Sequence, residues 1–125
     1  MLGNHALGAF VASTDLKRAR EFYAGTLGLS VTGEDGFALI LDAHGTILRV
    51  SKVETITPHP YTVLGWVVPD IHGMIAELTK RGVAFERYTF FQQDELGVWI
   101  SPDKTLVAWF KDPDGNFLSL SQHGT

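Results

Sequence analysis

Hydrophobic and polar positions along this chain follow the same order in two successive stretches. In the first, an apolar run over residues 10–12 is followed by Asp15, and apolar residues then recur with helical spacing over 16–23. This order predicts a strand and then a helix, which Asp15 caps at its N-terminus and which Gly25 or Gly28 ends.

The second stretch repeats this order further along the chain. Residues 63–68 form an apolar run, Asp70 follows as the expected N-cap, and apolar residues over 71–78 recur at the i, i+3, i+4 and i+7 positions of a helix that 80–82 closes. Both halves therefore predict a strand followed by a helix.

After each helix the pattern changes to short apolar and β-branched runs, which predict strands. These runs cover 30–32, 37–41 and 46–53 in the first half, and 83–89, 98–101, 105–111 and 117–122 in the second. The proline-rich segment 57–61 lies where a linker would join two repeats. We expect one domain over 1–125, with a first module at about 5–56 and a second at about 62–123.

These elements predict an α+β fold of two βαβββ modules. A helix would cover one face of each curved, mostly antiparallel sheet and leave the other face free, so that the two free faces can form a cup. Because side chains alternate along a strand, every second strand residue would point into this cup.

Composition narrows the functional classes. Of the 125 residues, 45% are apolar and 19% charged, as is typical of a globular protein that buries a core. Ten basic and fourteen acidic residues form no basic stripe, so we expect no nucleic-acid partner. The absence of cysteine excludes disulfides and thiolate sites. No run is apolar and long enough for a membrane helix, and residues 1–13 lack a signal-peptide pattern, so we expect a cytoplasmic protein with no membrane partner.

Several motifs resemble one known family over essentially the whole chain. They are FVASTDL at 10–16, EFY at 21–23, TLGL at 26–29, GWVVPDI at 65–71 and FKDPDGN at 110–116. Together they are similar to the vicinal oxygen chelate superfamily, which includes glyoxalase I, extradiol dioxygenases and bleomycin-resistance proteins. The resemblance implies the cupped fold, but one fold hosts many chemistries, so it implies no single activity.

The resemblance also identifies four cup-facing positions that hold a divalent ion in metal-using members, two usually histidine and two usually glutamate. Here these positions are Gly8, Val63, Arg49 and Ser119. Glycine and valine offer no side-chain donor, a guanidinium has no lone pair to give, and a lone serine hydroxyl is a poor ligand. We therefore expect no metal and no cofactor.

The five histidines do not supply an obvious replacement. No pair has a metal-site spacing, and each is expected at the surface. They are His5, His44, His59, His72 and His123. A metal site assembled in some other way remains an alternative.

Arg49 is the leading candidate for ligand binding, because its position in the family pattern points it into the cup. There it would either pair with a carboxylate of the protein or receive an anionic ligand through two charge-assisted bonds. Ser119 is expected opposite it, Ser51 shares the parity of Arg49, and Phe10 shares that of Gly8.

Aromatic residues are the second resource of the predicted site. Trp66 lies between two cup-facing positions and should point toward the helix, whereas at least one of Trp99 and Trp109 should line the pocket. The segment 90–95 departs from a strand pattern and would form a loop over the cup, with Gln93, Asp94 or Glu95 near the ligand.

Three functions are compatible with this site. The first is a metal-independent binding protein that captures a small anionic or aromatic molecule. The second is an enzyme of isomerase, lyase, hydrolase or dioxygenase type without the usual metal ligands, and the third is an interaction module with a closed cup. A base beside Arg49 would favour the enzyme, and the sequence places none. Family members commonly pair, so we expect a homodimer, with the cup formed within one chain or across two.

Overall fold

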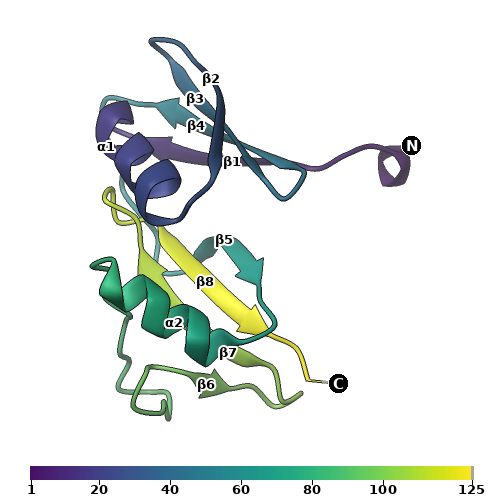
Figure 1. Ribbon diagram of the computed structural model, residues 1–125, viewed down its shortest axis with the longest axis vertical. Coiled ribbons are helices and arrows are strands. Elements are labelled where there is room, and N and C mark those ends of the chain that lie inside the picture. The colour runs from purple at the N-terminus through teal and green to yellow at the C-terminus, as the bar shows by residue number, and fades with distance from the viewer. Residues whose placement is uncertain (125) are drawn as a thin grey trace. The chain divides into compact units, whose positions relative to one another are not determined.

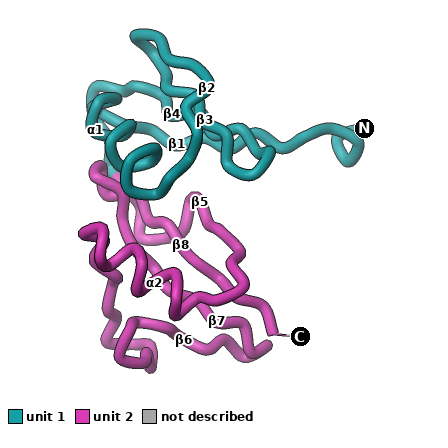
Figure 2. Tube along the Cα trace, viewed as in Figure 1, with its two compact units in different colours: residues 1–57 teal, residues 58–125 magenta. Residues whose placement is uncertain are grey.

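The computed structural model describes residues 1–124, which divide into two compact units. Unit 1 covers residues 1–57 and unit 2 begins at Pro58, as the two colours of Figure 2 show. Each unit carries one four-stranded sheet, here called sheet 1 and sheet 2 (Figure 1). The expected α+β fold of two modules that each begin with a strand and a helix is confirmed.

Unit 1 contains a mixed sheet whose first strand lies at its edge. Its strands are β1 (Gly8–Ser13), β2 (Ser30–Glu34), β3 (Ala38–Ala43) and β4 (Thr46–Lys52). Its helical segments are η1 (Leu2–Asn4), α1 (Leu16–Arg20) and η2 (Glu21–Thr26). The strand order is β1-β4-β3-β2, with β1 parallel to β4 and the other pairs antiparallel.

Unit 2 repeats this arrangement with a longer helix and a shorter edge strand. Its elements are β5 (Thr62–Val67), α2 (Ile71–Lys80), β6 (Trp99–Ile100), β7 (Leu106–Lys111) and β8 (Phe117–Gln122). The order is β5-β8-β7-β6, with β5 parallel to β8 and the remaining pairs antiparallel. Among the described residues, no helix is long and apolar enough to cross a membrane.

Both predicted helix caps are confirmed. The Asp15 carboxylate accepts a hydrogen bond from the Arg18 amide at 3.2 Å, and that of Asp70 accepts one from the Gly73 amide at 3.1 Å. Each bond satisfies one of the amide groups that a helix leaves unpaired in its first turn. After α1 the chain widens into the π-helical turns of η2 and leaves them at Gly28, whose φ of 82° is one that glycine tolerates best.

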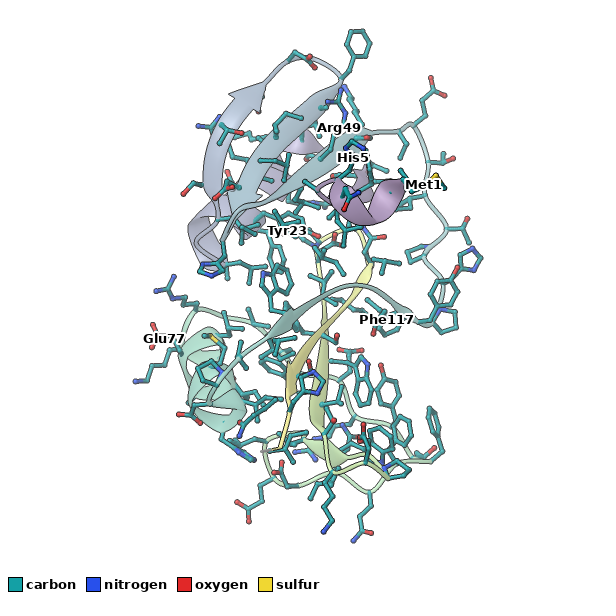
Figure 3. All side chains as sticks on the ribbon, turned by 90° about the vertical axis from the view of Figure 1, so that its right-hand side faces the viewer. Met1, His5, Tyr23, Arg49, Glu77 and Phe117 are labelled. Atoms are coloured by element: carbon teal, nitrogen blue, oxygen red, sulfur yellow. The ribbon has the colours of Figure 1, made fainter. Side chains whose placement is uncertain are left out.

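Alternating strand residues and one helix face form the core of each unit. In unit 1, Leu48 and Val50 of β4 are buried together with Ala19 and Tyr23 from the helical segments (Figure 3 labels Tyr23). In unit 2, the apolar face of α2 is buried with residues of β7 and β8, namely Ile71, Ile75, Leu78, Ala108, Phe110, Leu118 and Leu120. The opposite face of each sheet, here called its open face, carries the candidate functional residues.

Trp66 belongs to the core side of sheet 2, as its parity predicts. It pairs with the buried Leu120, and its ring stacks on Phe110 with 6.3 Å between ring centroids. The prediction that Trp66 points toward the helix is therefore confirmed.

The strand predicted over 83–89 is wrong, and the one predicted over 98–101 is reduced to β6. Only Phe85 forms an isolated bridge to β7, next to a 2.8 Å bond from the Glu86 amide to the Trp109 carbonyl. The chain then leaves the sheet over 87–98, here called the 87–98 loop, and returns as β6. Side chains within the loop bind its main-chain groups, so these need no strand partner.

Candidate functional site

The open face of sheet 1 places Arg49 in the middle of its strands. Arg49 of β4 lies between Phe10 of β1 and Ile40 of β3, and residues directly opposite in a sheet point to the same face. Phe10 is 66% exposed, and Arg49 is exposed as well (Figure 3 labels Arg49). Ser51 lies on the same face in the next row, between Ala12 and Ala38.

Arg49 has no ion-pair partner within 4 Å among residues 1–124. Arg49 acts electrostatically on Asp35 of the same unit. The amides of Phe37 and Ala38 donate to the Asp35 carboxylate at 2.8 and 2.9 Å and, with a smaller contribution from Arg49, hold the pKa of Asp35 below its ordinary value. The Arg49 guanidinium therefore keeps its hydrogen-bond donors available.

The open face of sheet 2 brings Trp109 and Ser119 together. Trp109 of β7 lies opposite Ser119 of β8, which lies opposite Gly65 of β5. A Cβ at Gly65 would stand 2.6 Å from the Ser119 hydroxyl oxygen, so the hydroxyl occupies the space that this glycine leaves open. In the next row, Trp99 pairs with Val107. The sequence left the two tryptophans unoriented, and the register puts both on the open face.

Five aromatic residues, here called the aromatic cluster, cover this part of sheet 2. They are Tyr88, Phe90 and Phe91 of the 87–98 loop, Trp99 of β6 and Trp109 of β7. Phe91 stacks on Trp99 with 4.6 Å between centroids, and on Trp109 with 5.3 Å and an interplanar angle of 6°. Tyr88 meets the Trp109 ring edge-on at 5.6 Å. Burial, followed by the nearby Glu86 carboxylate, raises the pKa of Tyr88, so its phenol stays neutral.

Gln93 binds the main chain of its own loop. Its amide nitrogen donates to the carbonyls of Glu86 at 3.0 Å and Gly97 at 2.8 Å, and its oxygen accepts from the Tyr88 amide at 2.8 Å. Both N–H donors of the side chain are thereby used. Arg87 likewise donates to the carbonyls of Asp94 and Glu95. A ligand contact of Gln93 stays a prediction, and its observed contacts shape the loop.

A pocket of about 470 Å³ lies at the outer edge of sheet 2, and the predicted ligand residues Gln93 and Trp99 are among those that line it. The sequence also suggested Asp94 near a ligand, but it did not predict the pairing of Asp94 with His72. His72 of α2 and Asp94 of the loop meet beside it with 2.7 Å between Nε2 and Oδ2. Ile100 and Leu106, which pair across β6 and β7, line it from the strands. The two polar residues are far apart in the chain, so no local sequence signal joins them.

Asp94 is ionised in this setting. Burial acts to raise the pKa of Asp94, but the hydrogen bond from His72 and the bonds from the Val98 and Leu96 amides outweigh it, and the pKa lies below its ordinary value. Asp94 thus links the loop to α2 while binding two amides of its own loop.

The four positions that the family resemblance assigns to metal ligands do not fit a metal ion. Gly8 and Arg49 lie on β1 and β4, and Val63 and Ser119 on β5 and β8. None brings a carboxylate or an imidazole. Within residues 1–124, no group of three or more His, Asp or Glu side chains could hold a metal ion.

Comparison with protein families gives a match along most of the chain. The model described as "Glyoxalase/Bleomycin resistance protein/Dioxygenase superfamily" matches residues 4–120 of the 125. None of the curated proteins matches the chain.

Solved structures share the fold over nearly the full length. A glyoxalase/bleomycin resistance protein/dioxygenase from Alicyclobacillus acidocaldarius is 18% identical with a TM-score of 0.73, covering 98% of this chain and 93% of its own. A lactoylglutathione lyase from Agrobacterium tumefaciens is 15% identical with a TM-score of 0.71, covering 95% and 93%. TnmS3, an antibiotic binding protein from Streptomyces sp. CB03234, is 25% identical with a TM-score of 0.71, covering 97% of each chain.

Proposed function

We propose, from the premise that this chain belongs to the glyoxalase/bleomycin resistance protein/dioxygenase superfamily, that it is a metal-independent binding protein for a small aromatic or anionic molecule. The observation that carries this proposal is the placement of Trp99 and Trp109 on the open face of sheet 2, with the Ser119 hydroxyl beside Trp109. Apolar aromatic walls with few polar groups are typical of small-molecule sites.

The same face favours binding over catalysis. Its strand residues in unit 2 include neither a histidine nor a carboxylate, so these strands supply no usual general base. TnmS3, which shares the fold at 25% identity, is an antibiotic binding protein, and this likeness supports a binding role here as well. The alternative of an enzyme without metal ligands lacks an observation of this kind.

Arg49 is the residue that we propose binds the anionic group of the ligand. Its guanidinium has no carboxylate partner within 4 Å in the described chain, and it lies on an open sheet face beside the exposed ring of Phe10. A planar guanidinium binds a carboxylate or a phosphate through two parallel hydrogen bonds. We therefore include Arg49, Ser51 and Phe10 among the proposed ligand contacts, together with Ser119, Trp99 and Trp109.

Calorimetry with 2-naphthoate tests this function. We expect wild-type protein to bind 2-naphthoate and Trp109→Leu to lose at least about tenfold in affinity for it. We expect Arg49→Gln to lose a similar factor for 2-naphthoate but not for an uncharged aromatic compound, because only the carboxylate binds the guanidinium. Phe37→Leu is the matched control, because Phe37 is an aromatic residue outside the proposed contacts and 80% exposed. Equal affinity in Trp109→Leu and wild type, or failure of wild type to bind any flat aromatic compound offered, would refute the proposal.

We further propose a homodimer that works in the cytoplasm. The exposed apolar side chains of Leu2 and Leu7 in unit 1 support association, and the absence of cysteine suits a reducing compartment. Light scattering coupled to gel filtration measures the mass, for which we expect twice the 13.7 kDa of one chain.

A further inference from the structure

We propose that Phe91 is an internal competitor for the ligand, and that a flat aromatic ligand binds by taking the place of the Phe91 ring on Trp99 and Trp109. This inference rests on the proposed function and goes further, because it selects planar aromatic compounds as the ligand class and gives residues 89–92 of the 87–98 loop the role of a lid.

The position of Phe91 is that of a stacked ligand. Its ring lies nearly parallel to Trp109, at 6° and 5.3 Å, and within 29° of Trp99 at 4.6 Å. The two indole rings are 6.0 Å apart and inclined by 34°, so each stacks more closely on Phe91 than on the other. Rings offset at such separations attract one another, and the attraction acts on any flat aromatic group of the right size.

The main chain that carries Phe91 is only loosely attached. Residues 89 and 90 form a turn, and in the described part of the chain residues 89–92 make no hydrogen bond beyond this turn, whereas the neighbouring Tyr88 and Gln93 are bonded within the loop. Gln93 also bridges to Trp99, which fixes the loop on the far side of Phe91. Aromatic packing therefore holds the segment 89–92 in place. A ligand ring that stacks on the two tryptophans can replace the contacts that the Phe91 ring makes.

The remaining link between the loop and α2 does not oppose this movement strongly. The His72 and Asp94 side chains are 46% and 45% exposed, and ion pairs with this exposure contribute little. Moreover, this link lies beyond Gln93 and can persist while Phe91 swings away. The closed and open positions of Phe91 therefore differ chiefly in the stacking on the two tryptophans.

Competition between Phe91 and the ligand predicts the direction in which a substitution at position 91 changes ligand affinity. The apparent affinity of a ligand that must displace Phe91 is its intrinsic affinity multiplied by the fraction of molecules in which the ring is already displaced. Removing the Phe91 ring should therefore tighten binding, whereas removing a residue that forms a fixed wall of the site would weaken it. A saturated ligand cannot replace the stacked ring and should gain nothing from the change.

The test is calorimetry of 2-naphthoate with Phe91→Ala, and with Phe91→Leu in case the smaller residue impairs folding. We expect Phe91→Ala to bind about tenfold tighter than wild type. Leu96→Ala is the matched control, because Leu96 is an apolar residue of the same loop that is 42% exposed and lies outside the aromatic cluster. Its affinity should stay within about twofold of wild type. The affinity for cyclohexanecarboxylate should be the same in all of these proteins.

A second measurement follows the ring itself. With 4-fluorophenylalanine at position 91, saturation with 2-naphthoate should move the fluorine resonance of the wild-type background toward that of a solvent-exposed ring. Unchanged or weaker binding by both Phe91 variants, or a fluorine resonance that does not move on saturation, would overturn the competitor role. The proposed function would then still stand if Trp109→Leu loses affinity. If no protein in the series binds 2-naphthoate, both proposals fall.

Discussion

The absence of a side chain at Gly65 leaves space for the hydroxyl of Ser119 on the neighbouring strand. The Ser119 hydroxyl oxygen lies 2.6 Å from where a Cβ of residue 65 would stand, and its main-chain oxygen lies 3.4 Å from that point. A position that sequence reasoning could explain only by its place in a motif therefore has a steric reason. The glycine allows the hydroxyl to sit on the open face beside Trp109.

We expect Gly65→Ala to destabilise the protein, because a hydroxyl packed below 3 Å must rotate or push the strands apart. The expected loss in the free energy of unfolding is about 1–3 kcal/mol, the usual cost of forcing an extra methyl group into a filled site. Urea unfolding measures it. Ser119→Ala combined with Gly65→Ala should recover part of the loss, and additive effects of the two substitutions would contradict a direct clash.

At the scale of single residues, the sequence predicted the helix caps and the orientation of Trp66, but not the orientation of Trp99 and Trp109. Asp15 and Asp70 were predictable as caps, because the signal lies within three residues of the helix start. The parity of Trp66 was predictable for the same local reason. The side on which Trp99 and Trp109 lie follows from the register of β6 on β7, which the sequence pattern leaves open.

At the scale of elements, the 87–98 loop is the main departure from the predicted repeat. The run from Val83 to Thr89 has strand-like composition, yet only Phe85 bridges to β7. Arg87 and Gln93 bind main-chain groups of the loop, and this alternative to a strand ladder depends on contacts that periodicity does not encode. The loop in turn carries Phe91 onto the tryptophans.

Asp94 should make the stability of this loop depend on acid pH. Its folded-state pKa lies below the ordinary value of 3.8, so its contribution is fully present above that value and is lost as the pH falls through the folded-state pKa. We expect Asp94→Asn to lower the free energy of unfolding by less than about 1 kcal/mol at about pH 5, because the pair with His72 is half exposed. In urea unfolding the difference from wild type should shrink toward about pH 2. A difference that is constant over this interval would show that the charge of Asp94 is not its cause.

At the scale of the whole molecule, the family match and the two repeated sheets agree, and the four positions that would hold a metal ion carry unsuitable side chains. The family fold was therefore predictable from motifs spread over the chain. The ligand was not, since the aromatic cluster arises only when the loop folds back on β6 and β7.

We expect protein purified without chelator to contain less than about one metal ion per ten chains by elemental analysis, because the positions offer no donor set for a divalent ion. Treatment with EDTA should leave the melting temperature and 2-naphthoate binding unchanged. Treatment with zinc followed by dialysis serves as the control for adventitious binding. A stoichiometric ion whose removal lowers both quantities would refute metal independence.

The shortness of β6 has a consequence for solubility. A sheet edge exposes a row of unpaired amide and carbonyl groups on which another chain can add a strand, and long flat edges promote aggregation. At its outer edge, sheet 2 ends in a strand of only two residues, Trp99 and Ile100. On sheet 1 the corresponding edge strand, β2, shifts register between Val31 and Gly33. At these two of the four sheet edges, intermolecular strands therefore find little regular backbone on which to grow.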